Sequence, residues 1–256
     1  AAGIQTRAVR SGDGYTITGT KAFITAGAVS DLAVVLAKTD PSMGHRGISA
    51  FIVERDRPGY VVGRKDDLMG MRGLATSELV FDNCWVPAEN LIGREGEGFK
   101  YVMESFNNGR IMIAALALGL AQAAMDESLQ YAQQRHAFGQ PIANFQAIQF
   151  MLADMAVQID AARLLIHRAA SLKDRGQPYI KEAAQAKLFA SDVAQRVATD
   201  AVQIHGGYGY TKEARVEQIY RDAKLTQIYE GTNQIQRIII AKQLLRSPTR
   251  PVGATA

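Results

Sequence analysis

The chain has 256 residues, of which 47% are hydrophobic and 21% charged, so it can bury a core and has the composition of a soluble globular protein of one or two domains. Its formal net charge of +4 comes from lysines and arginines that alternate with acidic residues. This pattern permits an anionic ligand and predicts no nucleic-acid partner. Cys84 is the only cysteine, which excludes a disulfide within the chain and predicts a small core residue.

Membrane and metal sites are not expected. No segment approaches the roughly 18 uninterrupted apolar residues of a membrane helix, and residues 1–15 do not resemble a signal peptide. The four histidines fall at no metal-ligand spacing.

Residues up to about Pro87 show the patterns of β-strands. Alternating or short apolar segments rich in β-branched residues are separated by the turn sequences SGDG, PSMGHRG and RDRPG. The expected strands are 15–25, 32–39, 47–54 and 77–87. We therefore predict a small, mostly antiparallel, β-barrel-like domain over residues 1–90.

From about Gly96 onward, apolar residues recur at helical spacing, with breaks at FGQP, DRGQP and HGGYGY. In the second expected helix they are alternately three and four residues apart, which is typical of a helix packed in a bundle. These residues are Phe145, Ile148, Leu152, Met155, Ile159, Ala162, Ile166 and Ala169. We predict an up-down helix bundle over residues 95–246, a tail over 247–256 and an α+β fold class; an intermolecular coiled coil is the weaker alternative.

The first expected helix has the same apolar seam, but one member is charged. The seam consists of Phe99, Met103, Phe106, Arg110, Ile113, Ala117, Leu120 and Ala124. A buried charge needs a partner. Arg110 therefore indicates either a salt bridge across the bundle or an anionic or polar ligand between the helices.

The stretch TQIYEGTNQIQR, residues 226–237, places Glu230 between two segments of helical spacing. Gly231 interrupts the pattern as a helix C-cap does, and Asn233 followed by Gln236 resembles the cap of the next helix. Burial statistics alone favour a solvated carboxylate at Glu230. The paired glycines of HGGYGY indicate either close approach of a ligand or a plain turn.

Four motifs occur in a fixed order along the chain: GEGFKYVM, RHAFGQPIANFQAIQFMLADM, QIHGGYGYTKEARVEQIYRDAK and IYEGTNQIQR. Together they resemble the acyl-CoA dehydrogenase family. The resemblance implies a flavoenzyme of fatty-acid β-oxidation that binds FAD, converts an acyl-CoA to its trans-2,3-enoyl-CoA and passes electrons to an electron-transfer flavoprotein. It also implies a homodimer or homotetramer in the cytoplasm, or in the mitochondrial matrix of a eukaryote.

The resemblance assigns the central chemistry to Glu230. This residue matches the family's general base, which removes the alpha proton of the thioester while the beta hydride goes to flavin N5. Its backbone N–H is expected to hydrogen-bond the thioester carbonyl. A minority of the family carries the base on the first bundle helix, at the position that is Gly109 here, so the glycine agrees with a base at Glu230.

The remaining predicted site residues also come from the resemblance. The substrate residues are Asn107, Arg110, Tyr229 and Gly231. The FAD residues, some of them serving a neighbouring subunit, are Phe23, Thr25, Arg135, Phe138, Gln146, Gln203, Gly206, Gly207, Thr232 and Gln234. Phe23 stands where the family often has tryptophan, which reduces the stacking area.

Two alternative functions stay open beside the dehydrogenase. One is a flavin-containing member of the family that binds nucleic acid or acts as a scaffold, and the other is an acyl-CoA oxidase. The intact YEGT motif and the lack of a lysine and arginine cluster argue against the first alternative. The oxidase would perform the same first half-reaction and stays open, although oxidases are usually longer chains. Because the family has an N-terminal helical domain before the segment AAGIQTRAVR, the resemblance implies a chain that lacks this domain and has little activity alone.

Overall fold

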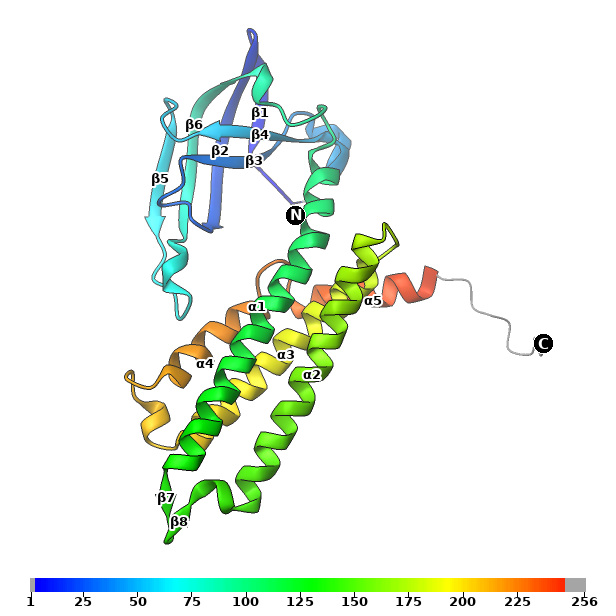
Figure 1. The fold of residues 1–256 in the computed structure, drawn as a ribbon. Coiled ribbons are helices and arrows are strands. Elements are labelled where there is room, and N and C mark those ends of the chain that lie inside the picture. Colours follow the sequence, from blue (N-terminus) through cyan, green and yellow to red (C-terminus); the bar gives the residue numbers. More distant parts are fainter. Residues whose placement is uncertain (1–2, 247–256) are drawn as a thin grey trace, which may run out of the picture. The chain divides into compact units, whose positions relative to one another are not determined.

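Residues 3–246 are described by the computed structural model, and their contacts divide the chain between Ser105 and Phe106 (Figure 1). We call the N-terminal part the β unit and the C-terminal part the helical unit. Each has a hydrophobic core of its own. The expected tail, 247–256, lies outside the described residues.

A six-stranded sheet forms the β unit. Its strands are β1 (Arg7–Ser11), β2 (Gly14–Ile24), β3 (Leu32–Lys38), β4 (Ile48–Glu54), β5 (Tyr60–Lys65) and β6 (Ser77–Pro87). They lie in the order β4-β3-β1-β2-β6-β5, and all neighbours are antiparallel except β1 and β3. The predicted antiparallel character is confirmed. The sheet is open, because β4 and β5 are its two edges, and β1 and β5 were not among the expected strands.

Alternating side chains of β2 and β6 build the core of the β unit. Tyr15 and Ile17 of β2 are buried, as are Leu79 and Phe81 of β6. This alternation is the period-2 pattern of a strand with one covered face. Cys84 is completely buried, as predicted, and burial raises the pKa of its thiol.

Five long or medium helices form the helical unit: α1 (Gly98–Gln134, which begins in the β unit), α2 (Gln146–Asp174), α3 (Ile180–His205), α4 (Arg215–Thr226) and α5 (Asn233–Arg246). A two-stranded hairpin, β7 (His136–Ala137) and β8 (Gln140–Pro141), separates α1 from α2. The helices end at the three predicted breaks. α3 packs against α2, α4 and α5, so it is the central helix of the unit (Figure 1).

The apolar seams agree with prediction in α2 and differ in part in α1. In α2 the predicted Met155, Ile159 and Ala162 are buried in the core, together with Ile166 and Ala169. In α1 the buried positions include Arg110, Ala114, Ala117, Leu118, Ala121, Ala124, Ser128 and Ala132. The predicted Ile113 and Leu120 are only half-buried.

The helix α1 is long and apolar enough, by length and composition, to cross a membrane. Sequence inspection alone had predicted no such segment. Ala114, Ala117, Ala121 and Ala124 of this helix belong to the hydrophobic core of the helical unit, and 28% of its apolar window is buried. A core helix of a helical domain meets the same criterion of length and apolarity.

Candidate active site

The loop between α4 and α5 carries Glu230. α4 ends at Thr226, where Gln227 forms the C-cap, so the predicted C-cap role of Gly231 is wrong. Gly231 lies within the loop at φ +90°. The predicted cap at Asn233 is also wrong: the Thr232 hydroxyl accepts a hydrogen bond from the backbone N–H of Ile235 at 3.4 Å, and the Asn233 side chain is buried.

Glu230 has an unusual backbone conformation. Its φ of +54° lies in the left-handed region, which costs a residue with a side chain on the order of 1 kcal/mol. Strain of this kind persists only where the surrounding structure enforces it, and it is concentrated at functional sites.

The carboxylate of Glu230 lies against Gly109 of α1. A Cβ atom at position 109 would lie 2.8 Å from Glu230 Oε2, closer than two such atoms can approach. Glycine at this position therefore leaves the space that the carboxylate occupies.

Burial dominates the electrostatics of Glu230. Its Oε2 atom is buried and has no hydrogen-bond partner among residues 3–246. Burial raises the pKa of the carboxyl group, while the Arg110 guanidinium and the Lys187 ammonium partly oppose the rise. The carboxylate is therefore half-buried and unpaired rather than a solvated charge.

The backbone N–H of Glu230 donates to no group in the described part of the chain. An unpaired amide beside an unpaired carboxylate provides a hydrogen-bond donor and a base within one residue. These are the two groups needed to polarise a carbonyl and to remove a proton next to it.

Arg110 is buried beside this loop, with 6% of its surface exposed. One of its terminal nitrogens donates to Asn107 Oδ1, whereas its Nε has no partner in the described residues. No carboxylate of residues 3–246 lies within 4 Å, so the predicted alternative of a salt bridge is not found. Burial lowers the pKa of Arg110, with Glu230 and Tyr179 acting in the opposite direction.

The predicted substrate residues thus surround Glu230. Asn107 and Arg110 come from α1, and Tyr229 and Gly231 flank Glu230 in the loop. Tyr229 is half-buried, and burial raises the pKa of its hydroxyl, with a further contribution from Glu230.

The predicted cofactor residues of the helical unit lie in separate places. Arg135, Gly206 and Gly207 line a cleft of about 570 Å³ at the C-terminal end of α3, where the Arg135 guanidinium lies 5.6 Å from the ring centre of Tyr208. Thr232 and Gln234 line a smaller cleft of about 210 Å³ beside α4 and α5. Phe138, Gln146 and Gln203 line neither cleft and are exposed.

The glycines of the larger cleft are not needed for packing within the chain. A Cβ atom at Gly206 or Gly207 would meet no other atom within 4 Å. Gly206 has φ +59° and ends α3, which accounts for the turn, whereas the space above both glycines is open to a ligand or a second chain.

Phe23 and Thr25 belong to the β unit, at the end of β2. The pairing of β2 with β6 shifts register between Lys21 and Ile24, and Phe23 lies in this irregularity at φ +55°. Its ring is 71% exposed, and Thr25 is exposed beside it. A large apolar ring held outward by a bulge is suited to contact with a planar ligand.

Among residues 3–246, no three His, Cys, Asp or Glu side chains are close enough to hold a metal ion. One group of contacts lay outside the sequence-based expectations. Lys187, Ser191 and Asp192 of α3 contact the residues around Glu230 and were not predicted. The signal was available in the spacing, because Lys187 falls on the alanine-rich buried face of α3 between Ala183 and Ala190.

Comparison with known proteins places these observations in one family. Residues 1–84 match the acyl-CoA dehydrogenase middle domain, and residues 96–245 match the acyl-CoA dehydrogenase C-terminal domain. The chain belongs to the acyl-CoA dehydrogenase family. An acyl-CoA dehydrogenase of Bacillus subtilis is 53% identical over 245 residues, covering 96% of this chain and 65% of the relative.

Solved acyl-CoA dehydrogenase-like structures share the fold of this chain. Butyryl-CoA dehydrogenase from Megasphaera elsdenii is 51% identical with a TM-score of 0.94, covering 96% of this chain and 64% of that chain. A chain from a study of the electron transferring flavoprotein of Acidaminococcus fermentans is 53% identical, with a TM-score of 0.94 and the same coverage. The α+β fold of the family is thereby confirmed. This chain spans slightly less than two thirds of these relatives.

Proposed function

We propose that this chain forms part of an FAD-dependent acyl-CoA dehydrogenase, which converts an acyl-CoA to its trans-2,3-enoyl-CoA with Glu230 as the general base. The observation that carries the proposal is the half-buried, unpaired carboxylate of Glu230 beside its own unpaired backbone N–H. The relatives named as acyl-CoA and butyryl-CoA dehydrogenases support the substrate class.

Proton removal requires a base and an electrophile that act together. The alpha carbon of a thioester is a weak acid, because the carbanion is stabilised only as charge moves onto the carbonyl oxygen. The Glu230 carboxylate takes the alpha proton, and the Glu230 N–H donates to the carbonyl oxygen. Burial already raises the pKa of Glu230, and an apolar acyl chain in the site would exclude more water and raise its basicity further.

Asn107 and Arg110 serve the ligand side of this site. The Arg110 guanidinium is buried and has a free Nε donor, so a polar or anionic part of the ligand can supply the acceptor that the described residues do not. Its positive charge also keeps the pKa of Glu230 from rising further.

The residues present fit an FAD cofactor. Phe23 offers an exposed ring at a bulge, and the cleft at Gly206 and Gly207 leaves backbone open beside the cation of Arg135. In the helical unit, Arg135, Gly206 and Gly207 would hold the phosphate groups of an FAD molecule, and in the β unit, Phe23 and Thr25 would contact a flavin ring. FAD, when bound, supplies the acceptor for the hydride that leaves the beta carbon.

The two clefts of the helical unit suit two different cofactor molecules. Asp192, which lines the smaller cleft, and His205, which lines the larger one, are both in α3 and about 20 Å apart at 1.5 Å per residue. We propose that the cleft at Arg135 serves the FAD of a neighbouring subunit, in a homodimer or homotetramer. The electron acceptor that we propose is an electron-transfer flavoprotein, in line with the subject of the Acidaminococcus fermentans study.

The test is the visible spectrum of the flavin during anaerobic mixing with a panel of acyl-CoAs. The whole protein that the gene encodes is used. We expect bleaching by at least one acyl-CoA in the wild type and a loss of two orders of magnitude or more in the rate of bleaching in Glu230→Gln, which keeps size but removes the base. Acyl-CoA binding should largely survive.

The control is Glu213→Gln, an exposed carboxylate in the same unit, which should bleach at the wild-type rate. Near-normal bleaching in Glu230→Gln would refute the assignment of the base. A flavin that no acyl-CoA bleaches would refute the function, and rapid reoxidation by oxygen, with none by an electron-transfer flavoprotein, would indicate an oxidase.

A further inference from the structure

A lysine ammonium is buried directly beneath the loop that carries Glu230. Lys187 of α3 has no exposed surface, and the alanines around it on the same face of the helix are also completely buried. Its Nζ donates to the backbone oxygen of Gly231 at 2.9 Å and to Asn233 Oδ1 at 3.0 Å. Both acceptors are neutral, and no carboxylate of the described residues lies within 4 Å of this ammonium.

Burying an ammonium on neutral acceptors is unfavourable. A leucine or methionine at this position would complete the apolar face of α3 without that cost. The pKa of Lys187 is lowered to about 8 by burial, which expresses the same cost; Asp192 and Glu230 act against the shift and Arg110 acts with it. Packing of the apolar face of α3 alone does not account for a lysine here.

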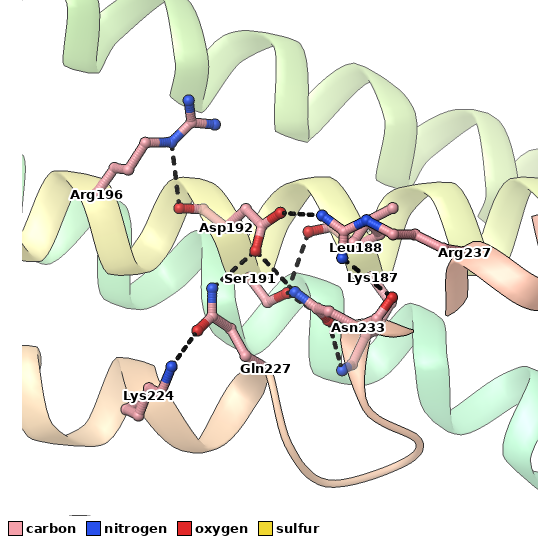
Figure 2. Close-up of polar contacts among 9 residues, drawn as sticks. All are labelled: Lys187, Leu188, Ser191, Asp192, Arg196, Lys224, Gln227, Asn233 and Arg237. Carbon is pink, nitrogen blue, oxygen red and sulfur yellow. Dashed lines mark hydrogen bonds and ion pairs between the residues drawn. The ribbon is translucent and has the colours of Figure 1, made fainter. Parts of the chain in front are cut away.

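The contacts of Asn233 and Asp192 extend this arrangement over both ends of the loop (Figure 2). The Asn233 side-chain amide donates to Ser191 Oγ at 2.9 Å and to Asp192 Oδ1 at 2.8 Å. Gln227, at the start of the loop, donates to the same Asp192 oxygen at 2.7 Å. Residues 187–192 of α3 therefore hold the first residue, the middle and the end of the loop 227–233.

Two side chains hold the backbone at the base. The Gly231 oxygen accepts from Lys187 Nζ at 2.9 Å and from Gln236 Nε2 at 2.8 Å, and the same Gln236 amide donates to the Glu230 backbone oxygen at 3.3 Å. Glu230 and Gly231 both have positive φ, and the Glu230 carboxylate has no hydrogen bond that could fix it. The position of the carboxylate is thus set by the backbone that follows it.

We infer that Lys187 is a positioning residue for proton abstraction: its ammonium holds the Gly231 carbonyl and thereby fixes the backbone that aims Glu230. The catalytic consequence of this inference rests on the proposed function. The statement that Lys187 holds the backbone of the Glu230 loop does not depend on that function. The same ammonium acts on the charge of Glu230. The charged and titratable groups facing that carboxylate are Arg110 of α1, Lys187 of α3 and the neighbouring Tyr229.

The experiment compares Lys187→Met and Lys187→Gln in the whole protein that the gene encodes. Methionine removes both the charge and the hydrogen bonds, whereas glutamine removes the charge but can still donate to Gly231. Lys181→Met is the matched control. Lys181 lies on the same helix and is partly exposed, and its ammonium is 3.2 Å from the Glu182 carboxylate rather than bonded to the loop.

The first readout is amide hydrogen exchange in the absence of substrate at Ile228, Tyr229 and Asn233, whose backbone N–H groups donate to Leu225 and Gln227. We expect exchange at least roughly 10-fold faster in Lys187→Met, a smaller increase in Lys187→Gln and none in Lys181→Met. Unchanged exchange in both Lys187 variants would overturn the inference, whether or not the protein oxidises an acyl-CoA. If Lys187→Met does not fold, the exchange in Lys187→Gln decides.

The second readout is flavin reduction by the acyl-CoA that bleaches the wild type. In Lys187→Met the rate constant should fall roughly 10-fold to 100-fold with acyl-CoA affinity changed much less, because a misplaced base slows the chemical step. The flavin-reduction rate should rise with pH as Glu230 loses its proton. Because loss of the nearby ammonium raises the pKa of Glu230, this rise should shift to higher pH by roughly half a unit or more in both Lys187 variants. Variants with the wild-type rate and an unchanged pH dependence would overturn the catalytic consequence of the inference. A wild-type protein whose flavin is bleached by no acyl-CoA would instead refute the proposed function.

Discussion

At the scale of the residue, the site depends on groups that lack partners. Glu230 Oε2, the Glu230 N–H and Arg110 Nε are all left without a hydrogen bond by the described residues. A buried polar atom without a partner costs on the order of 1–3 kcal/mol. A ligand that satisfies these atoms would recover that free energy on binding.

Gly109 gives a direct test of this geometry. Gly109→Ala adds a methyl group whose carbon would lie only 2.8 Å from Glu230 Oε2. We expect flavin reduction to slow by roughly 10-fold to 100-fold, because the carboxylate must move away from its position. The stability of the helix should be unchanged or rise, since alanine is favoured over glycine in a helix by about 1 kcal/mol.

Gly119→Ala is the control for that substitution. Gly119 lies in the same helix, and its added Cβ would meet nothing within 4 Å. It should gain the same helix propensity and reduce its flavin at the wild-type rate. Equal rates in the two alanine variants would show that Gly109 is not required by the carboxylate.

At the scale of the element, helices were easier to predict than strands. The apolar spacing of α2 is sustained along most of its 29 residues, so its buried face followed from the sequence alone. β1 was missed because only one of its five residues, Ala8, is buried, which leaves little alternation of apolar side chains. β5 was missed because Gly63 and the basic residues at its end interrupt its apolar pattern. In α1 the buried Ala114 and Ala121 are less apolar than the neighbouring Ile113 and Leu120. The predicted seam was therefore placed on the isoleucine and leucine rather than on the alanines.

α2 also has apolar residues on its outer face. Phe150, Val157 and Leu164 are seven residues apart and are 64%, 69% and 69% exposed. Residues spaced by seven lie on one side of a helix, so these side chains form a stripe. An exposed stripe of this kind is typical of a surface that contacts another chain.

We expect this stripe to lie in the contact between copies of the chain. Leu164→Glu introduces a charge into the stripe and should lower the apparent mass measured by analytical ultracentrifugation. Lys173→Glu, at the exposed end of the same helix, should leave the mass unchanged. A Leu164→Glu protein that keeps the wild-type mass would exclude the stripe from the contact.

At the scale of the whole molecule, the sequence predicted residues for the candidate site but not the contacts that hold them. The motif around Glu230 is local, so its residues could be assigned by resemblance. The support from Lys187 and Asp192 spans more than forty positions along the chain, as the hydrogen bond from Lys187 to Gly231 shows. Contacts at such separations follow from the packing of α3 against α5, which periodicity does not specify.

The buried ammonium of Lys187 links folding to proton binding. Its pKa is about 8 in the folded protein, against about 10.4 for an unperturbed lysine. Between these values the unfolded chain binds the extra proton, so the free energy of unfolding of the helical unit should rise as the pH increases from 8. In the β unit, the pKa of Lys21 is also lowered, which likewise makes the free energy of unfolding rise with pH. The raised pKa of Cys84 acts in the opposite direction.

Chemical denaturation between pH 7.5 and about 9.5, below the range in which tyrosines ionise, would measure this linkage. The slope of the free energy of unfolding against pH should correspond to at most about one extra proton bound by the unfolded chain. This slope should disappear in Lys187→Met. A free energy of unfolding that is flat with pH in the wild type would show that the ammonium is not destabilised by its surroundings. With the predicted slope, mild alkali strengthens the fold while it neutralises the charge that holds the Glu230 loop, so stability and proton abstraction should have their optima at different pH.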